Sequence, residues 1–210
     1  NFGGVTAVDV DHIEVQRGSI TALIGPNGAG KTTLFNLLTG FDTPDTGEWR
    51  FDGRSLAKVV AHKAASMGMV RTFQLTKSLT KMSVIENMKL GATHQVGERW
   101  WNGLFPFRWK AQEKLIEQRA DQLLQRFKLD HMRNEYAGTL SGGQRKLLEM
   151  SRALMTNPRL VMLDEPMAGV NPALKQSLNE HIRGLRDDGM TVLFVEHDMD
   201  MVHDVSDWVI

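Results

Sequence analysis

The order of apolar and polar residues along the chain predicts strands that alternate with helices. Residues 8–15 alternate between apolar and polar side chains apart from one step, which is typical of a half-buried strand. Further strands are predicted at 19–24, 49–51, 67–73, 159–163, 191–195 and 208–210. Apolar residues at helical spacing predict helices over 32–39, 111–127 and about 172–186. This alternation indicates an α/β fold with a mostly parallel sheet that is covered by helices on both faces.

The middle of the chain has a different pattern. It is largely helical from about residue 84 to 128, and a further helix follows Gln144. We therefore predict a sheet core formed by residues 1–75 and 155–210, into which residues 76–154 are inserted as a helical subdomain.

Composition narrows the class of protein. Of 210 residues, 41% are hydrophobic and 24% are charged, which is ordinary for a globular chain. The 25 basic and 25 acidic residues balance, whereas nucleic-acid binders usually carry a basic excess. The chain contains no cysteine, which rules out disulfides, thiolate metal sites and cysteine nucleophiles. It also contains no run of about 18 apolar residues that could span a bilayer.

Residues 25–32 read GPNGAGKT and match the phosphate-binding loop pattern GxxxxGK[ST]. Glycines let the backbone wrap around a pyrophosphate, and the N-terminus of the following helix points at its negative charge. Lys31 can reach the β- and γ-phosphates, and the Thr32 hydroxyl can bind Mg²⁺. The alternative, a merely flexible glycine loop, does not require the strand before it and the helix after it. We expect nucleotide contacts from Asn27, Gly28, Ala29, Gly30, Lys31, Thr32 and Thr33.

Asp164 and Glu165 follow a buried strand of sequence LVML. Such a pair is often an ordinary surface feature, but open α/β sheets bind ligands at the carboxyl ends of their strands. Together with the phosphate-binding loop, the pair predicts that Asp164 holds Mg²⁺ through its water shell. Glu165 is then predicted to act as the general base on the attacking water.

Residues 140–144 read LSGGQ and precede a helix. Ser141 and Gln144 have the spacing of a capping box, so the segment is consistent with a simple helix start. That interpretation leaves Gly142 and Gly143 unexplained, because a Ser-Gly-Gly helix N-terminus is also an anion-binding site. One nucleotide needs one phosphate cradle, so a second cradle suggests a role toward the nucleotide of another copy.

These residues resemble the nucleotide-binding domain of ABC transporters across essentially the whole chain. The resemblance implies a RecA-like P-loop NTPase core with a helical signature subdomain and a small antiparallel β part. In VRTFQ, Gln74 resembles the Q-loop residue that senses Mg²⁺ and the attacking water, and His197 resembles the switch histidine. Phe2 lies where the family places an aromatic ring against adenine.

The resemblance also implies a mechanism and partners. Two copies close around two ATP molecules, and Ser141, Gly142, Gly143 and Gln144 of one subunit cover the nucleotide of the other. A second ABC ATPase subunit, identical or related, and transmembrane permease subunits are the expected partners, with a periplasmic or extracellular solute-binding protein acting indirectly. The expected location is peripheral, on the cytoplasmic face of the cell (inner) membrane, and no nucleic-acid partner is expected.

One branch of the family matches more closely than the others. Residues 168–172 read AGVNP, in which Asn171 replaces the usual aspartate of the family. This segment is typical of ATPases that resemble those of branched-chain amino acid importers, and residues 35–41 and 70–74 resemble the same group. The cargo alternatives are urea, other amino acids, or export of a lipopolysaccharide-type lipid.

An aromatic patch with basic neighbours lies between Trp100 and Trp109. Two interpretations stay open at this point: contact with the membrane surface or the permease, and a local core at the end of the helical lobe. Both termini also suggest a chain trimmed from something longer, since it starts without methionine and ends in an incipient strand.

Other classes of protein fit the sequence less well. A soluble ABC protein that acts on nucleic acid usually has two such domains or a coiled-coil insertion, whereas this chain has one set of motifs and no sustained heptads. A GTPase should show an Asn-Lys-x-Asp base reader, and none is present. A module that binds ATP without turnover would not need Glu165 and His197.

Overall fold

The computed structural model describes residue 4 and residues 6–56, 59–72, 79–92 and 106–210. Contacts divide the chain into two compact units. The first unit comprises residues 1–74, 158–168 and 172–210, and the second comprises residues 75–157 and 169–171. The phosphate-binding loop and Glu165 belong to the first unit, and the LSGGQ segment belongs to the second.

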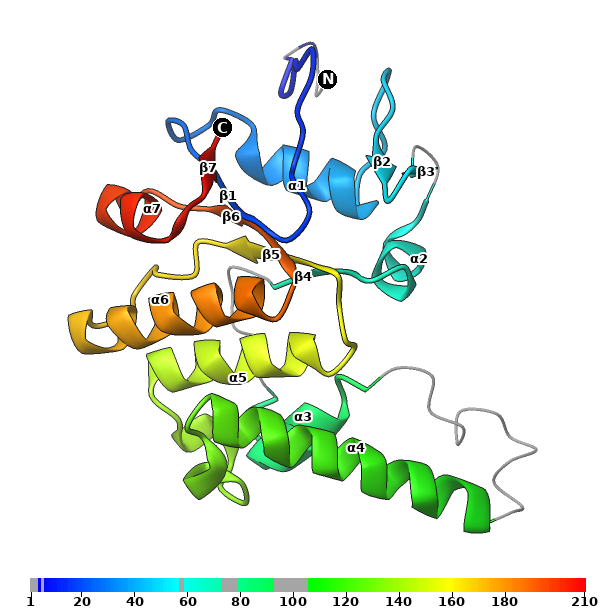
Figure 1. The fold of residues 1–210 in the computed structure, drawn as a ribbon, viewed down its shortest axis with the longest axis vertical. Helices are drawn as coiled ribbons and strands as arrows, with labels where there is room; N and C mark the ends of the chain where they lie inside the picture. The colour runs from blue at the N-terminus through cyan, green and yellow to red at the C-terminus, as the bar shows by residue number, and fades with distance from the viewer. Residues whose placement is uncertain (1–3, 5, 57–58, 73–78, 93–105) are drawn as a thin grey trace. The chain divides into compact units, whose positions relative to one another are not determined.

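A five-stranded sheet forms the centre of the first unit, in the order β4-β5-β6-β1-β7 (Figure 1). Every neighbouring pair is parallel, as predicted for strands that alternate with helices. The strands are β1 (Ile20–Leu23), β4 (Met69–Arg71), β5 (Leu160–Asp164), β6 (Thr191–Val195) and β7 (Trp208–Val209). The predicted small antiparallel part is also present, as β2 (Arg50–Phe51) paired with β3 (Arg54–Ser55).

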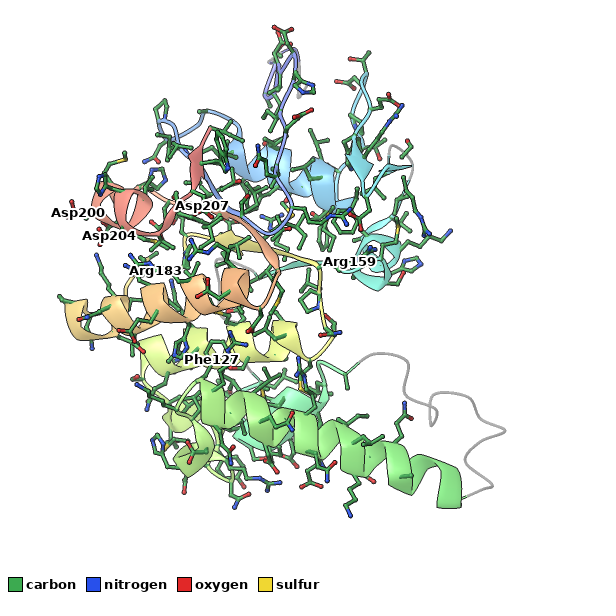
Figure 2. All side chains as sticks on the ribbon, in the orientation of Figure 1. Phe127, Arg159, Arg183, Asp200, Asp204 and Asp207 are labelled. Carbon is green, nitrogen blue, oxygen red and sulfur yellow. The ribbon has the colours of Figure 1, made fainter. Side chains whose placement is uncertain are left out.

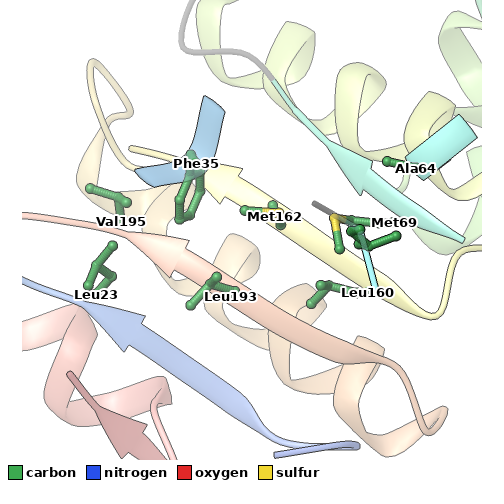
Figure 3. Packing of buried hydrophobic residues seen from close by; sticks show 9 residues of the cluster. Leu23, Phe35, Ala64, Met69, Leu160, Met162, Leu193 and Val195 are labelled. Carbon is green, nitrogen blue, oxygen red and sulfur yellow. The ribbon is translucent and has the colours of Figure 1, made fainter. Parts of the chain in front are cut away.

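Helices cover the sheet on both faces, with α1 on one side and α6 on the other (Figure 1). The helices of this unit are α1 (Lys31–Thr39), α2 (Ala61–Ser66), α6 (Pro172–Asp187) and α7 (Met199–Val205). Every residue of β1, β5 and β6 is buried, which explains why these strands read as continuous apolar runs. On one face, Phe35 of α1 packs with Met162, Leu193 and Val195 in a buried cluster (Figure 3).

Ion pairs and hydrogen bonds fix α6 and α7 beside the sheet. Arg183 of α6 donates to the backbone oxygen of Asp204 of α7 at 2.5 Å, and these side chains lie near one another in Figure 2. Arg186 pairs with Asp207 at 2.9 Å, and the other oxygen of Asp207 accepts the backbone N–H of Ile20 at 2.8 Å. The start of β1 is thereby tied to the C-terminal region of the chain.

The second unit is helical. Its elements are α3 (Val84–Lys89), α4 (Pro106–Arg126), α5 (Gly142–Leu154) and the short 3₁₀ helices η3 (Asp130–Met132) and η4 (Ala137–Thr139). The three α-helices contact one another around buried residues such as Met88, Phe127 and Leu148 (Phe127 is labelled in Figure 2). No helix among the described residues has the length and apolar character needed to cross a membrane.

One predicted strand is wrong. Residues 6–15 form no strand, and Val10 is exposed. Alternating side chains are only half of what a strand requires, because the backbone must also find a ladder partner. Within the described part of the chain, this segment pairs with no other strand.

Candidate functional site

Three neighbouring strands place predicted site residues at one edge of the sheet. β1, β6 and β5 are adjacent and parallel, so their carboxyl ends meet at the same edge. The phosphate-binding loop follows β1. Asp164 is the last residue of β5, Glu165 comes directly after it, and His197 comes two residues after β6. This edge is where open α/β sheets bind their ligands.

The loop between β1 and α1 is exposed from Pro26 to Ala29. Within it, Lys31 Nζ donates to the carbonyl oxygens of Gly25 at 2.8 Å and Pro26 at 2.9 Å. The ammonium group is therefore already folded back over the loop that it belongs to. Phosphate oxygens would offer it stronger, charged acceptors in the same place.

Two glycines of the loop differ in the space that surrounds them. Gly28 and Gly30 both have positive φ angles, of 83° and 84°. A Cβ on Gly28 would meet nothing within 4 Å, whereas a Cβ on Gly30 would lie 2.0 Å from the carbonyl oxygen of Ala7. The N-terminal segment thus packs directly against the start of α1.

A buried arginine connects α1 with the end of β5. Arg71 Nη2 donates to Asp164 Oδ2 at 2.7 Å, and the two side chains are only 6% and 4% exposed. Arg71 Nη1 also donates to Asn36 Oδ1 of α1 at 2.6 Å, and its guanidinium lies 5.5 Å from the ring centroid of Phe35. The orientation of Asp164 is therefore set by a residue of β4 that is itself held by α1.

The oxygen donors at this edge suit Mg²⁺. Thr32 is exposed in the first turn of α1, and Asp164 Oδ1 is not the oxygen that Arg71 engages. Mg²⁺ usually binds to one or two protein oxygens plus waters and substrate phosphates. Thr32 and Asp164 supply oxygen atoms of this kind at the sheet edge that carries the phosphate-binding loop, so the residues present fit the ion.

Glu165 and His197 form a pair at the ends of β5 and β6. His197 Nε2 lies 3.3 Å from Glu165 Oε1, and both side chains remain partly exposed. Glu165 has a φ angle of 46°, a conformation that costs a non-glycine residue about 1–2 kcal/mol. Backbone strain of this kind is concentrated at functional sites. A solvent-facing carboxylate beside an imidazole can orient and deprotonate a water molecule.

The LSGGQ segment begins α5 with a complete capping box, as predicted. Ser141 Oγ accepts the N–H of Gln144 at 3.3 Å, and Gln144 Oε1 accepts the N–H of Ser141 at 2.9 Å. Gly142 is exposed, and a Cβ there would meet nothing within 4 Å. The cap therefore accounts for Ser141 and Gln144, whereas packing within its own unit does not require a glycine at position 142.

Replacing Ser141 by Ala should lower the free energy of unfolding by about 1 kcal/mol, because a backbone N–H of α5 loses its acceptor. Urea denaturation followed by circular dichroism measures this loss. Ser141→Thr keeps the hydroxyl and should stay within about 0.5 kcal/mol of the wild type. An equal loss in both variants would contradict a capping role.

Some predicted site residues lie outside the described residues. These are Phe2, Gln74 and the aromatic patch from Trp100 to residue 105. Conversely, two residues that contact the site were not predicted from sequence, namely Arg71 and Glu196. A charged side chain at the end of an apolar strand could have indicated both residues. Arg71 is the last residue of β4, and Glu196 directly follows β6.

Comparison with known proteins identifies similar chains. Residues 8–168 match a family model described as ABC transporter. A probable branched-chain amino acid transport ATP-binding protein LivG from Archaeoglobus fulgidus is 41% identical over 208 residues, which cover 99% of this chain and 80% of that relative. The high-affinity branched-chain amino acid transport ATP-binding protein BraF from Pseudomonas aeruginosa is 39% identical over 211 residues. The alignment covers 100% of this chain and 83% of that relative.

Solved structures show the same fold. A nucleotide-free ATP-binding cassette from an ABC transporter aligns over 100% of this chain and 83% of its own, with a TM-score of 0.85 and 39% identity. The ADP conformation of an ATP-binding cassette of an ABC transporter aligns over the same shares, with a TM-score of 0.85 and 40% identity.

Proposed function

This chain belongs to the ABC transporter family as an ATP-binding cassette, and from that membership we propose that it hydrolyses ATP to drive import of branched-chain amino acids. The predicted family resemblance and the predicted P-loop NTPase fold are both confirmed. The observation that carries hydrolysis is the contact between Glu165 and His197, at the same sheet edge as the phosphate-binding loop.

In this proposal, residues 27–33 bind the phosphates of ATP. Lys31 exchanges the carbonyl oxygens of Gly25 and Pro26 for the β- and γ-phosphates, which are charged and accept stronger hydrogen bonds. The backbone N–H groups at the start of α1 point toward the same phosphates. Phe2, by resemblance, stacks on the adenine.

Hydrolysis requires a water molecule in line with the γ-phosphate. Glu165 accepts a proton from this water, and His197 orients the carboxylate and the γ-phosphate. Thr32, Gln74 and Asp164 are the proposed residues for Mg²⁺, which when bound offsets charge on the phosphates. Arg71 keeps Asp164 in one orientation and so keeps Oδ1 directed to this task.

The second phosphate cradle is assigned to a second subunit. Ser141, Gly142 and Gly143, followed by Gln144, are proposed to cover the γ-phosphate bound by another ATPase chain. The open space around Gly142 supports this assignment, because an approaching phosphate needs room beside the backbone. ATP thereby joins two subunits, and loss of the γ-phosphate lets them separate.

Transmembrane permease subunits are the proposed recipients of this motion. The chain then sits peripherally on the cytoplasmic face of the membrane, and a solute-binding protein delivers the cargo from the other side. The cargo assignment rests on relatives that are named for branched-chain amino acid transport.

ATP-driven uptake of labelled leucine into vesicles tests the proposal. The protein is reconstituted with the membrane subunits that co-purify with it, and Glu165→Gln serves as the inactive control. Uptake should require ATP, should be competed by valine and isoleucine, and should be lost in the variant. Hydrolysis without leucine uptake would contradict the cargo and would favour urea, other amino acids or lipid export.

A further inference from the structure

Glu196 is a buried carboxylate that accepts hydrogen bonds from the backbone near both members of the proposed hydrolytic pair. It directly follows β6, and its relative exposure is 4%. A charged group this deeply buried is costly unless several hydrogen bonds compensate it. The hydrogen-bond donors to Glu196 therefore indicate its structural role.

Its two oxygens accept three backbone N–H groups from two different segments. Oε1 accepts from Met167 at 2.6 Å. Oε2 accepts from His197 at 3.0 Å and from Asp198 at 3.4 Å. Hydrogen bonds to an ionised acceptor are about twice as strong as neutral ones, so one side chain binds both segments firmly.

Both segments carry a member of the pair. Met167 lies two residues after Glu165, and Oε2 holds the backbone of His197 itself. The N–H of Glu165 is fixed separately, by the carbonyl oxygen of Val195 at 3.0 Å. Backbone hydrogen bonds at Glu165 and at Met167 thus tie this segment to the end of β6, and the Glu165 carboxylate lies 3.3 Å from His197 Nε2.

We propose that Glu196 is a positioning residue that holds His197 within reach of Glu165 by anchoring the backbone beside each of them. The inference rests on the proposed function, in which these two residues act on the attacking water. Glu196 itself is buried and touches neither water nor phosphate in this scheme.

Glu196→Gln is the sharpest test, because it preserves shape and removes one acceptor. The new amide must point its NH₂ group either at Met167 N–H or at the N–H groups of His197 and Asp198, so a donor faces a donor. A displacement of roughly 1 Å at a reacting group can cost about 100-fold in rate, so kcat should fall about 10- to 100-fold. KM for ATP should stay within about twofold, because the phosphate-binding loop is not contacted.

Glu180→Gln is the matched control. It makes the same chemical change at an exposed position of α6, and it should leave kcat and KM at wild-type values. A loss of active protein is separated from a loss of kcat by titrating the ATP-binding sites of each sample before the assay.

Two further measurements distinguish positioning from a general structural role. Amide hydrogen exchange should accelerate in Glu196→Gln at Met167 or at His197, whichever N–H faces the new NH₂ group and has lost its acceptor. In a His197→Ala background, Glu196→Gln should add less than about a twofold loss, since residues that act through one another are not additive. An equal loss in both backgrounds, or unchanged exchange, overturns the proposal.

Glu165→Gln in the same assay tests the hydrolytic pair independently of the role of Glu196. If Glu165→Gln leaves kcat unchanged, the proposed hydrolytic pair is wrong. If Glu165→Gln abolishes turnover but Glu196→Gln does not lower kcat, the pair stands and only the role of Glu196 is overturned.

Discussion

Replacing Glu165 by Gln is expected to lower kcat for ATP hydrolysis by about 10²–10⁴-fold, which is the usual contribution of a general base. The amide has the same shape as the carboxylate and can keep a contact with His197, but it cannot accept a proton from water. ATP affinity should change little, because the phosphates are bound by the loop after β1. Phosphate release measures kcat, and calorimetric titration measures the dissociation constant.

Lys31→Ala is the informative counterpart, since it removes the ammonium group that the proposal assigns to the phosphates. It should weaken ATP binding itself, whereas Glu165→Gln should spare binding and lose turnover. Residual turnover above about one tenth of the wild type in Glu165→Gln would mean that another group deprotonates the water.

Replacing Arg71 by Met should lower the free energy of unfolding by about 3–5 kcal/mol, which is typical when one partner of a buried ion pair is removed. Methionine fills similar space but leaves Asp164 buried without its cation, and Asn36 also loses a donor. The expected result is a lower urea midpoint with an unchanged denaturant slope.

The double variant Arg71→Met/Asp164→Asn is the control for this effect. It removes both charges, so it should recover much of the stability lost by Arg71→Met alone, because the unpaired carboxylate is no longer present. A loss below about 1 kcal/mol in Arg71→Met would show that Asp164 finds another partner or water.

Local signals in the sequence were sufficient for most of the fold. β6 begins and ends where the apolar run 191–195 predicted, and α1 stops before Gly40 as expected. Burial on both faces makes these runs continuous and easy to recognise. Residues 8–15 show the opposite case, since a strand at the surface depends on a partner that its own pattern does not reveal.

In the candidate site, too, some features could be predicted from the sequence and others could not. The sequence pattern placed Asp164 and Glu165 at the end of a strand, and the family resemblance singled out His197 after another. Parallel strands bring these residues to one edge of the sheet. The contacts that hold these residues join positions far apart in the chain: Arg71 lies 93 residues from Asp164, and Glu196 lies 29 residues from Met167. Such pairings depend on which strands become neighbours, and no local pattern encodes that.

The carbonyl oxygen of Ala7 occupies the space that a side chain at position 30 would need. A methyl group at Gly30 collides with the backbone of another segment, whereas one at Gly28 enters open space. The N-terminal segment therefore packs against the start of α1. Both glycines have positive φ angles, but only Gly30 is also constrained by a neighbouring segment. A defect caused by substituting Gly30 therefore reflects lost packing against Ala7 as much as lost contact with phosphate. A defect caused by substituting Gly28 reflects only the conformation and contacts of the loop itself.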